Sequence, residues 1–331
     1  MNGFISVIIP FKGDKEELHA LLCEIENVFS NGKLKNNYEL IVIDDDSNYS
    51  AEEIKNINCS FDLIKLDKGY GASYCRNLGA EKAKGDYFLF LDADISINTD
   101  FDEKLSAYID SNIDFDVLTS IYTPKYKEND FLSLYKNIYL SYHLSQFQNP
   151  VNFLVGAVCL FKRESFIKFD INTSHVEDTE LAQRLIQKNK KIHFAKDLCV
   201  EHKKKYNLWR FIENNFRVPF KFCKPFLMYK RKDPASFSHA SFLQLLSISL
   251  VGLSLIGLFI RFELVLYILL LFFLINIKYY VYILKNSNLF FLILSMITHY
   301  IDSMIMGLGI LSGLIWYGIS GTCLKKINAN A

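Results

Sequence analysis

Gly85-Asp86-Tyr87-Phe88-Leu89-Phe90-Leu91-Asp92-Ala93-Asp94 is the stretch of this chain that decides its fold. Tyr87 to Leu91 is a short, uninterrupted apolar run, which predicts a strand buried on both faces in a sheet covered by helices. Asp92 and Asp94 follow at its carboxyl end, where open α/β sheets place their ligands. Because two adjacent carboxylates repel each other, the pair indicates a divalent cation that in turn holds a diphosphate. A strand end followed by a helix cap explains the same residues structurally.

Strands and helices alternate through about the first 95 residues. β-branched runs predict the strands, and apolar residues at helical spacing predict the helices. The expected strands are residues 5–9, 38–43 and 62–66, and the expected helices are residues 14–29, 52–57 and 72–84. This alternation predicts an α/β fold with a mostly parallel sheet.

Two further segments place polar residues at the ends of expected elements. A helix is expected to begin near Asp178, whose carboxylate would lie at the positive end of the helix dipole, although helix capping alone also explains an aspartate there. His202 follows an expected strand at residues 197–200, and a single histidine is more often structural than a ligand. Another helix is expected at residues 131–148.

The C-terminal part of the chain is strongly apolar. Residues 241–331 hold only seven charged side chains, and three runs within them reach the roughly 20 residues that a helix needs to cross a bilayer. We expect spans near residues 242–260, 264–284 and 295–319. The third belongs to an apolar run, residues 289–319, that fits one tilted helix or an interfacial piece plus a span. His299 and Asp302 near its middle fit contact with a neighbouring helix at least as well as a functional role.

Charge and cysteine patterns indicate a compartment. No basic start or cleavage site opens the chain, so no signal peptide is expected, and seven scattered cysteines favour reduced thiols. Basic residues precede the first expected span, which places the preceding domain in the cytoplasm. We therefore expect a multi-pass protein of the cell membrane. Its expected parts are a cytosolic domain at 1–225, a linker at 226–240, a transmembrane region at 241–320 and a tail at 321–331.

Basic and aromatic residues are mixed between Lys203 and Lys232. Just before a span, this mixture fits a segment that lies on an anionic leaflet. Nucleic acid is not expected as a partner, because the span begins about ten residues later and the formal net charge of the chain is only +1. Presentation of a lipid-linked acceptor and simple anchoring explain the segment equally well.

Six short motifs occur in a fixed order over about residues 4–205. They are Ser6–Pro10, Ile43–Ser47, Ala72–Gly79, Gly85–Asp94, Gly156–Ala157 and Glu177–Asp178. This ordered set resembles glycosyltransferase family 2, which has the nucleotide-sugar-binding GT-A fold, and the segments at 131–137 and 202–206 resemble a membrane-bound subgroup of it. Asp46 stands where the family usually has glycine and Tyr49 where it commonly has aspartate, which changes the expected turn geometry.

The resemblance implies roles on the donor side of a reaction. Pro10 and Asp45 would line the nucleoside pocket, with Asp45 accepting a hydrogen bond from the base. Arg76 would contact the diphosphate. Asp92 would bind the ribose side or a metal-bound water.

The resemblance also implies the metal ligands and the base. Asp94 would ligate Mg²⁺ or Mn²⁺, both of which prefer oxygen ligands, with Asp92 beside it and His202 in contact with the metal or the diphosphate. Asp178 would be the general base for the acceptor hydroxyl, and Glu177 is the alternative.

The implied reaction is inverting, metal-dependent transfer of one sugar from a nucleotide sugar, with a UDP-sugar as the family-level expectation. A lipid-linked or membrane-proximal glycan of the cell envelope would be the acceptor. The Gln-x-x-Arg-Trp segment of processive synthases is missing after Asp178, which favours single-sugar transfer. Two alternatives remain open: a polyprenyl-phosphate glycosyltransferase, and a catalytically silent membrane scaffold that keeps a nucleotide-sugar fold.

Overall fold

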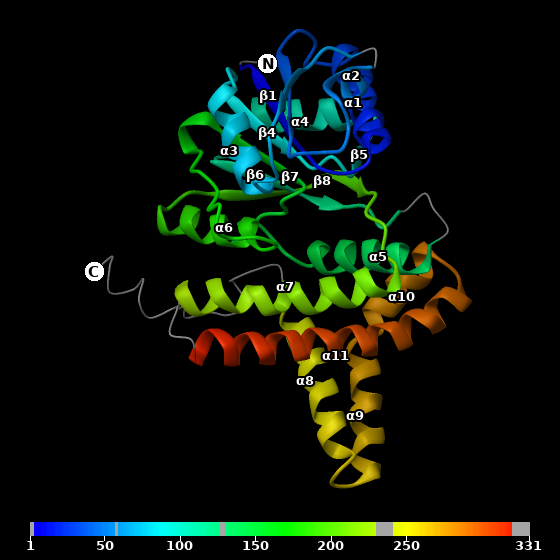
Figure 1. Cartoon of the computed structure of the whole chain (residues 1–331). Helices are drawn as coiled ribbons and strands as arrows, with labels where there is room; N and C mark the ends of the chain where they lie inside the picture. Colours follow the sequence, from blue (N-terminus) through cyan, green and yellow to red (C-terminus); the bar gives the residue numbers. More distant parts are fainter. Residues whose placement is uncertain (1–2, 57–58, 126–129, 230–240, 320–331) are drawn as a thin grey trace. The chain divides into compact units, whose positions relative to one another are not determined.

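The computed structural model describes residues 3–56, 59–125, 130–229 and 241–319 (Figure 1). They pack as two compact units, one drawn from Met1–Thr123 and Gln148–Lys204, the other from Pro124–Phe147 and Lys205–Ala331. Packing therefore groups α5 (Phe131–Ser145) and α7 (Leu208–Tyr229) with the C-terminal helices. The expected limits at residues 225 and 240 stay predictions, and the linker at 226–240 lies largely outside the described residues.

The first unit is built on a mixed sheet with the strand order β3-β2-β1-β4-β7-β6-β8-β5. The strands are β1 (Ile5–Phe11), β2 (Tyr38–Asp44), β3 (Asp62–Lys65), β4 (Tyr87–Leu91), β5 (Ile95–Ile97), β6 (Val117–Tyr122), β7 (Val158–Lys162) and β8 (Ile192–His202). β1, β2, β3 and β4 pair in parallel. β7 is antiparallel to β4 and β6, β5 is antiparallel to β8, and β6 is parallel to β8. The expected α/β fold with a mostly parallel sheet is confirmed.

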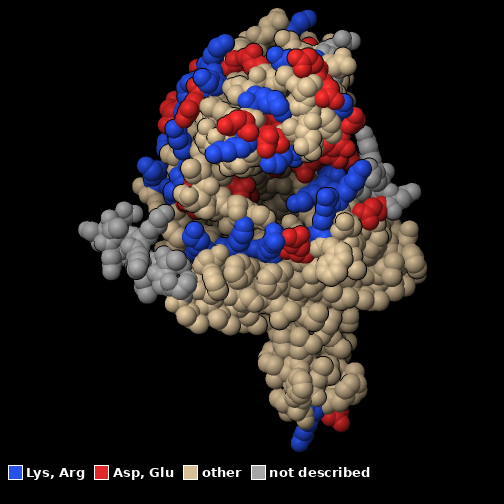
Figure 2. Space-filling model, viewed as in Figure 1, with Lys and Arg blue, Asp and Glu red and all other residues tan. Residues whose placement is uncertain are grey.

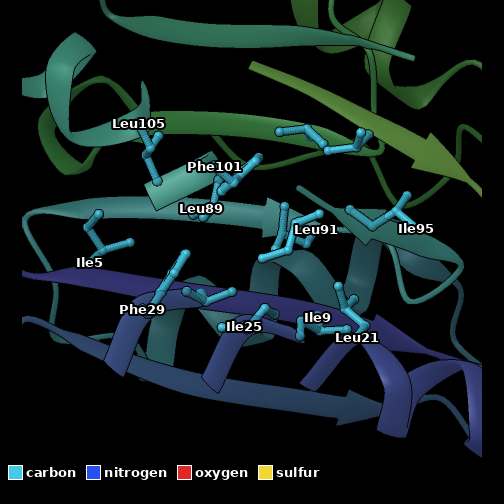
Figure 3. Packing of buried hydrophobic residues seen from close by; sticks show 14 of the residues in the cluster. Ile5, Ile9, Leu21, Ile25, Phe29, Leu89, Leu91, Ile95, Phe101 and Leu105 are labelled. Carbon is cyan, nitrogen blue, oxygen red and sulfur yellow. The ribbon is translucent and has the colours of Figure 1, made fainter. Parts of the chain in front are cut away.

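One face of this sheet is covered by α1 (Lys15–Ser30) and α4 (Phe101–Asp110). Because side chains alternate between the faces of a strand, every second residue of β1 and β4 points toward these helices. Figure 3 shows the result: Ile5, Ile9, Leu89 and Leu91 pack against side chains of α1 and α4. Each is essentially fully buried, and burial of one such side chain stabilises the fold by about 1.5–3 kcal/mol.

The opposite face of the sheet carries α3 (Ala72–Lys82), which packs very closely on β1. A Cβ atom at Gly79 would lie only 2.3 Å from the Cγ2 atom of Ile8, so this close approach requires glycine. α3 ends two residues before the expected limit at residue 84, because Ala83 has an extended conformation. The two other α-helices of this unit in the described residues are α2 (Ala51–Lys55) and α6 (Glu177–Gln187).

The last long strand differs from the expectation. β8 begins at Ile192 rather than at residue 197, and His202 is its final residue instead of following it. The pairing of His202 with Ile95 of β5 extends the strand to this point. His202 is thereby held beside the turn that follows β4.

The second unit is helical in its described part. Besides α5 and α7 it contains α8 (Phe242–Gly257), α9 (Phe262–Ile275), α10 (Ile277–Asn286) and α11 (Leu289–Ile319). Within the described residues only α11 alone is long and apolar enough to cross a membrane, and α9 with α10 passes this test only as a pair bent by 55°.

Three spans are therefore not supported by helix length. α8 has only 16 residues, since Leu258 to Ile260 leave the helix before Arg261. The second expected span is broken at Asn276, whose buried amide donates to the Ser247 hydroxyl at 2.9 Å and to the Phe272 carbonyl at 2.9 Å. The third lies inside the continuous 31-residue helix α11.

α7 and α11 lie side by side along much of their lengths (Figure 1). Two glycines of α11 make this possible, because a Cβ atom at Gly309 would lie 2.4 Å from the Phe216 carbonyl oxygen and one at Gly313 would lie 2.5 Å from that of Phe220. Both contacts advance in the same direction, so the two helices run parallel.

The second unit also buries a charged pair. The Asp302 carboxylate of α11 lies 3.9 Å from the Lys136 ammonium group of α5 and accepts a hydrogen bond from the Tyr135 hydroxyl at 3.2 Å. His299 accepts from or donates to the Tyr280 hydroxyl at 3.1 Å. His299 and Asp302 thus both face neighbouring helices.

Candidate active site

A hollow of about 330 Å³ opens in the first unit at the carboxyl ends of β1, β2 and β4. The residues around it come from segments far apart in the sequence. Those with polar or charged side chains are Lys12, Asp14, Glu17, Asp45, Cys75, Arg76, Asp92, Asp94 and Glu177, and Pro10 also lines it. The volume is within the range of small-molecule sites. This is the place where open α/β sheets bind their ligands.

Asp92 and Asp94 both line this hollow, as the sequence predicts, but they lie beyond the strand. β4 ends at Leu91, and the two aspartates belong to the turn that leads into β5. Residues two positions apart in a strand point to the same side, but Asp92 and Asp94 are not in a strand. Their turn, and not strand alternation, therefore brings the two carboxylates to the hollow. The turn is held by the pairing of β5 with β8 and by the Lys203 amide, which donates to the Asp94 carbonyl at 2.7 Å.

Arg76 of α3 connects two carboxylates of the hollow. Its Nη2 atom donates to Asp92 Oδ1 at 2.7 Å and its Nη1 atom donates to Glu177 Oε1 at 3.3 Å. The side chain is only 4% exposed, and burial alone would lower its pKa, but Asp92 and Glu177 outweigh burial and raise the pKa of Arg76 above its ordinary value. A charged guanidinium group thus fixes the turn after β4 to the start of α6.

Asp178 lies next to Glu177 in the first turn of α6 and is held by backbone amides. Thr179 donates to its Oδ1 atom at 2.6 Å, and Gly156 donates to its Oδ2 atom at 3.3 Å. The side chain keeps some solvent exposure, yet the surrounding protein desolvates it and the neighbouring Glu177 adds a like charge, which together raise the pKa of Asp178 to about 7. A carboxyl group with such a pKa can accept a proton near neutral pH.

Glu177 rather than Asp178 lines the hollow itself. Its Oε1 atom is paired with Arg76, whereas its Oε2 atom is buried and has no hydrogen-bond partner among the described residues. The two carboxylates of this turn therefore have different partners: Glu177 is paired with a cation, whereas Asp178 accepts from two backbone amides and, at 3.4 Å, from the Thr179 hydroxyl.

Asp45 follows β2 and fixes a neighbouring loop. Its two oxygens accept from the amides of Tyr70 at 2.5 Å and of Gly71 at 3.0 Å, and Lys12 Nζ lies 4.0 Å from Oδ2. Asp46 has φ = +62°, the left-handed conformation that favours glycine. This explains why the resemblance places glycine at that position.

His202 is not among the residues that line the hollow, but its Nε2 atom lies 3.6 Å from Oδ2 of Asp94, which does line it. Burial lowers the pKa of His202, so the ring is neutral at pH 7 and suited to metal ligation. No group of three or more His, Cys, Asp or Glu side chains within the described residues is arranged to enclose a metal ion. The donor set still fits Mg²⁺ or Mn²⁺, because such ions are commonly held by one or two carboxylates together with substrate phosphates.

Sequence reasoning missed Lys12, Asp14 and Glu17 as lining residues. Lys12 is the most informative of them, because its side chain is 57% exposed at a site where a diphosphate is expected. The signal was present in the sequence: Lys12 comes two residues after Pro10, directly beyond the first strand. Asp14 is the N-cap of α1, and its side chain accepts from the Glu16 amide at 3.0 Å.

Residues 6–169 match the sequence model of the family described as glycosyl transferase family 2. The chain carries a glycosyltransferase family 2 domain. Among curated relatives, an uncharacterized glycosyltransferase of Haemophilus influenzae is 32% identical over 33% of this chain and 35% of its own length. The poly(ribitol-phosphate) β-N-acetylglucosaminyltransferase TarP of Staphylococcus aureus is 37% identical over 27% and 28%. The dolichol-phosphate mannosyltransferase of Pyrococcus furiosus is 33% identical over 28% and 26%. Each alignment covers about a third or less of the relative.

Two solved structures resemble the chain over most of its length. The mannosyltransferase PcManGT from Pyrobaculum calidifontis, in complex with GDP-Man and Mn²⁺, has a TM-score of 0.56 and 13% identity, covering 95% of this chain and 87% of its own. Residues 1–349 of S. aureus TarS have a TM-score of 0.50 and 16% identity, covering 95% and 92%. At this identity the likeness concerns the fold, and it confirms the expected GT-A architecture of the family 2 domain.

Proposed function

We propose that this protein is a membrane-attached glycosyltransferase that moves one sugar from a nucleotide sugar to a lipid-linked or membrane-proximal glycan acceptor, with inversion at the anomeric carbon. The observation that carries the proposal is the hollow lined by Asp45, Asp92, Asp94 and Glu177, in which Arg76 pairs with Asp92 and Glu177. The family 2 domain supports the reaction class.

On the donor side, Pro10 and Asp45 would contact the nucleoside, for which we propose uridine. The exposed Lys12 ammonium group would meet the diphosphate. Arg76 was expected in that role, but both of its terminal nitrogens are bound to carboxylates. Its contribution would therefore be to position Asp92 and Glu177, and its charge would reach the diphosphate only through space.

Asp94, with Asp92 or His202, would hold Mg²⁺ or Mn²⁺. The bound cation would offset the negative charge that gathers on the departing nucleoside diphosphate. Asp94 is less engaged than Asp92, because Asp92 is paired with Arg76 at 2.7 Å. The neutral ring of His202 adds no charge to the site.

On the acceptor side, Asp178 would take the proton of the attacking hydroxyl group. A base with a pKa of about 7 is half ionised at neutral pH and matches the proton transfer it has to perform. Glu177 stays the alternative base, although its pairing with Arg76 suits it better to a fixed anionic role. A single displacement assisted by one base inverts the anomeric configuration.

A polyprenyl phosphate is the second candidate acceptor. The similarity to the dolichol-phosphate mannosyltransferase of Pyrococcus furiosus favours it. Both candidates place the acceptor at a membrane, and the apolar C-terminal helices support attachment there, with the first unit on the cytoplasmic side.

The decisive experiment uses the full-length protein in detergent with a panel of nucleotide sugars. Extracted membrane lipid, bare polyprenyl phosphate and no acceptor are compared, with Mg²⁺, Mn²⁺ or EDTA, and sugar-bearing lipid is identified by mass spectrometry. We expect transfer with one donor, loss with EDTA, and loss in Asp94→Ala and Asp178→Asn. Asp114→Asn is the matched control, because this carboxylate is 72% exposed and lies on the surface. Nucleotide binding without transfer to any acceptor would instead favour a silent scaffold.

A further inference from the structure

α11 has its polar side inward and its apolar side outward. Its buried face carries Ser295, His299, Asp302 and Ser303. Its exposed face carries large apolar side chains, among them Phe290, Ile293, Ile297, Leu308, Leu311 and Ile315. This arrangement is the reverse of a helix on the surface of a water-soluble unit. It is expected where the helix faces hydrocarbon.

The packing of α7 against α11 nevertheless argues against α11 as a membrane span. α7 runs parallel to it through the contacts at Gly309 and Gly313, so a membrane-spanning α11 would take α7 with it. The charged residues of α7 are Arg210, Glu213, Arg217, Lys221 and Lys224, spaced so that they share one side of the helix. Charged side chains are strongly disfavoured in hydrocarbon. They suit the headgroup layer, where basic side chains meet anionic lipids.

The lengths of α11 and α8 also favour a position of α11 along the membrane surface. α11 has 31 residues and is about 46 Å long, whereas the hydrocarbon core of a bilayer is about 30 Å thick. α8 has 16 residues and is about 24 Å long. With the turn that joins it to α9, that length approaches the thickness of the core.

The α8–α9 hairpin has the surface of a membrane-inserted element. Figure 1 shows it projecting away from α7 and α11, and in Figure 2 its surface is uncharged except at the tip. Its only charged residues are Arg261 and Glu263, both at that tip. The hydroxyl groups of Ser247 and Ser249 donate to backbone carbonyls of their own helix at 2.8 and 2.9 Å. They therefore need no water.

The base of the hairpin is marked by Asn276. The chain bends there by 55° between α9 and α10, and charges resume beyond it at Lys278 and Lys285. The bend thus coincides with the end of the stretch that tolerates hydrocarbon.

We propose that the α8–α9 hairpin is the element inserted into the bilayer, with Arg261 and Glu263 directed to the far headgroup layer. α7 and α11 lie along the near surface, with the apolar face of α11 in the acyl boundary. The long apolar helix α11 then lies on the membrane surface. The shorter helices α8 and α9, neither of which alone is long enough to count as a candidate span, cross or nearly cross the membrane. This inference rests on the membrane attachment proposed above, but on no part of the sugar-transfer chemistry.

The test measures depth with single tryptophans. The chain has two, Trp209 and Trp316, both largely exposed, and phenylalanine replaces them in the full-length background. Leu308→Trp reports the middle of α11 and Leu270→Trp reports the middle of the hairpin, at positions of similar exposure, 50% and 56%. Each variant is reconstituted in phosphatidylcholine–phosphatidylglycerol vesicles that carry bromine at a shallow or a deep acyl position.

We expect shallow bromines to quench the Leu308→Trp variant more strongly than deep ones, and the reverse order for Leu270→Trp, which lies midway along the hairpin. Ile301→Trp and Leu271→Trp, also at exposed positions, repeat the comparison if either variant unfolds. Deep quenching at the middle of α11, or shallow quenching in the hairpin, would overturn the inference. Failure to float with vesicles would overturn membrane attachment as well. The expected depths without any sugar transfer would leave this inference standing and count against the proposed function.

Discussion

Arg76 is the residue on which two carboxylates of the hollow depend. In Arg76→Gln, Asp92 and Glu177 lose their cation while remaining 31% and 18% exposed. Leaving such charges uncompensated should cost about 3 kcal/mol of unfolding free energy. Arg76→Lys should recover part of this loss, because lysine keeps the charge but not the two-pronged geometry.

Urea unfolding and transfer kinetics together check this prediction. Lys168→Gln is the matched control, since its ion pair with Glu81 is exposed and should contribute less than about 1 kcal/mol. If Arg76 positions the carboxylates, kcat should fall in Arg76→Gln while the KM for the donor changes little. A large rise in that KM alone would instead favour direct contact with the diphosphate.

Asp178 predicts a pH dependence of transfer. Burial and Glu177 raise its pKa to about 7, so the carboxyl group is protonated and inactive as a base at pH 5.5 and ionised at pH 8.5. The rate should therefore rise with pH through about 7. Asp178→Asn should lower kcat by about 10²–10⁴-fold and remove that rise. A rise of the same midpoint in the residual activity of Asp178→Asn would assign the titration to another group.

Gly309 and Gly313 control packing at the scale of whole helices. Gly309→Ala and Gly313→Ala each place a Cβ atom within about 2.5 Å of a backbone carbonyl oxygen of α7, so α7 and α11 must separate. We expect each substitution to destabilise the protein by about 1–3 kcal/mol. Gly318→Ala, in the same helix, meets nothing within 4 Å and should be neutral. Thermal unfolding in detergent separates the variants, and equal melting temperatures for all three would contradict the packing.

The spacing of apolar residues predicts a helix or strand well where that segment alone shows a helical or strand period. The predicted strands and helices before residue 95 reappear with shifts of one or two residues. The α9–α10 break could not be read from the apolar run, because its cause is the pairing of Asn276 with Ser247, 29 positions earlier. The length of β8 likewise depends on its neighbours, since Ile95 and Val117 pair at its two ends.

At the scale of the whole molecule, the buried pair Lys136–Asp302 joins segments 166 positions apart in the chain. Lys136 and Asp302 are 7% and 0% exposed, so Lys136→Met leaves an uncompensated charge and should cost about 3–5 kcal/mol. The double variant Lys136→Met/Asp302→Leu removes both charges and should be more stable than that single variant. A double variant whose loss equals the sum of the two single losses would show that the groups do not interact.

The candidate site was predictable as a set of residues but not as an arrangement. Asp45, Asp92, Asp94, Arg76, Pro10 and Glu177 all line the hollow, and each could be named from motifs. The double pairing of Arg76 joins residues 16 and 101 positions apart, and no local pattern encodes it. The division into units is equally non-local, because α5 is assigned by what it packs against and not by its place in the chain.

The grouping of α5 with the C-terminal helices bears on how a water-soluble fragment can be prepared. Ending the chain near residue 205 keeps α5 yet removes the helices that cover its Tyr135, Ile138 and Tyr139 side chains. The truncated protein would expose these large, mostly aromatic side chains to water and should precipitate. A fragment that also replaces residues 124–147 with a Gly/Ser connection from Thr123 to Gln148 removes these aromatic side chains together with their partners. It is the better starting point for crystals with nucleotides bound in the hollow.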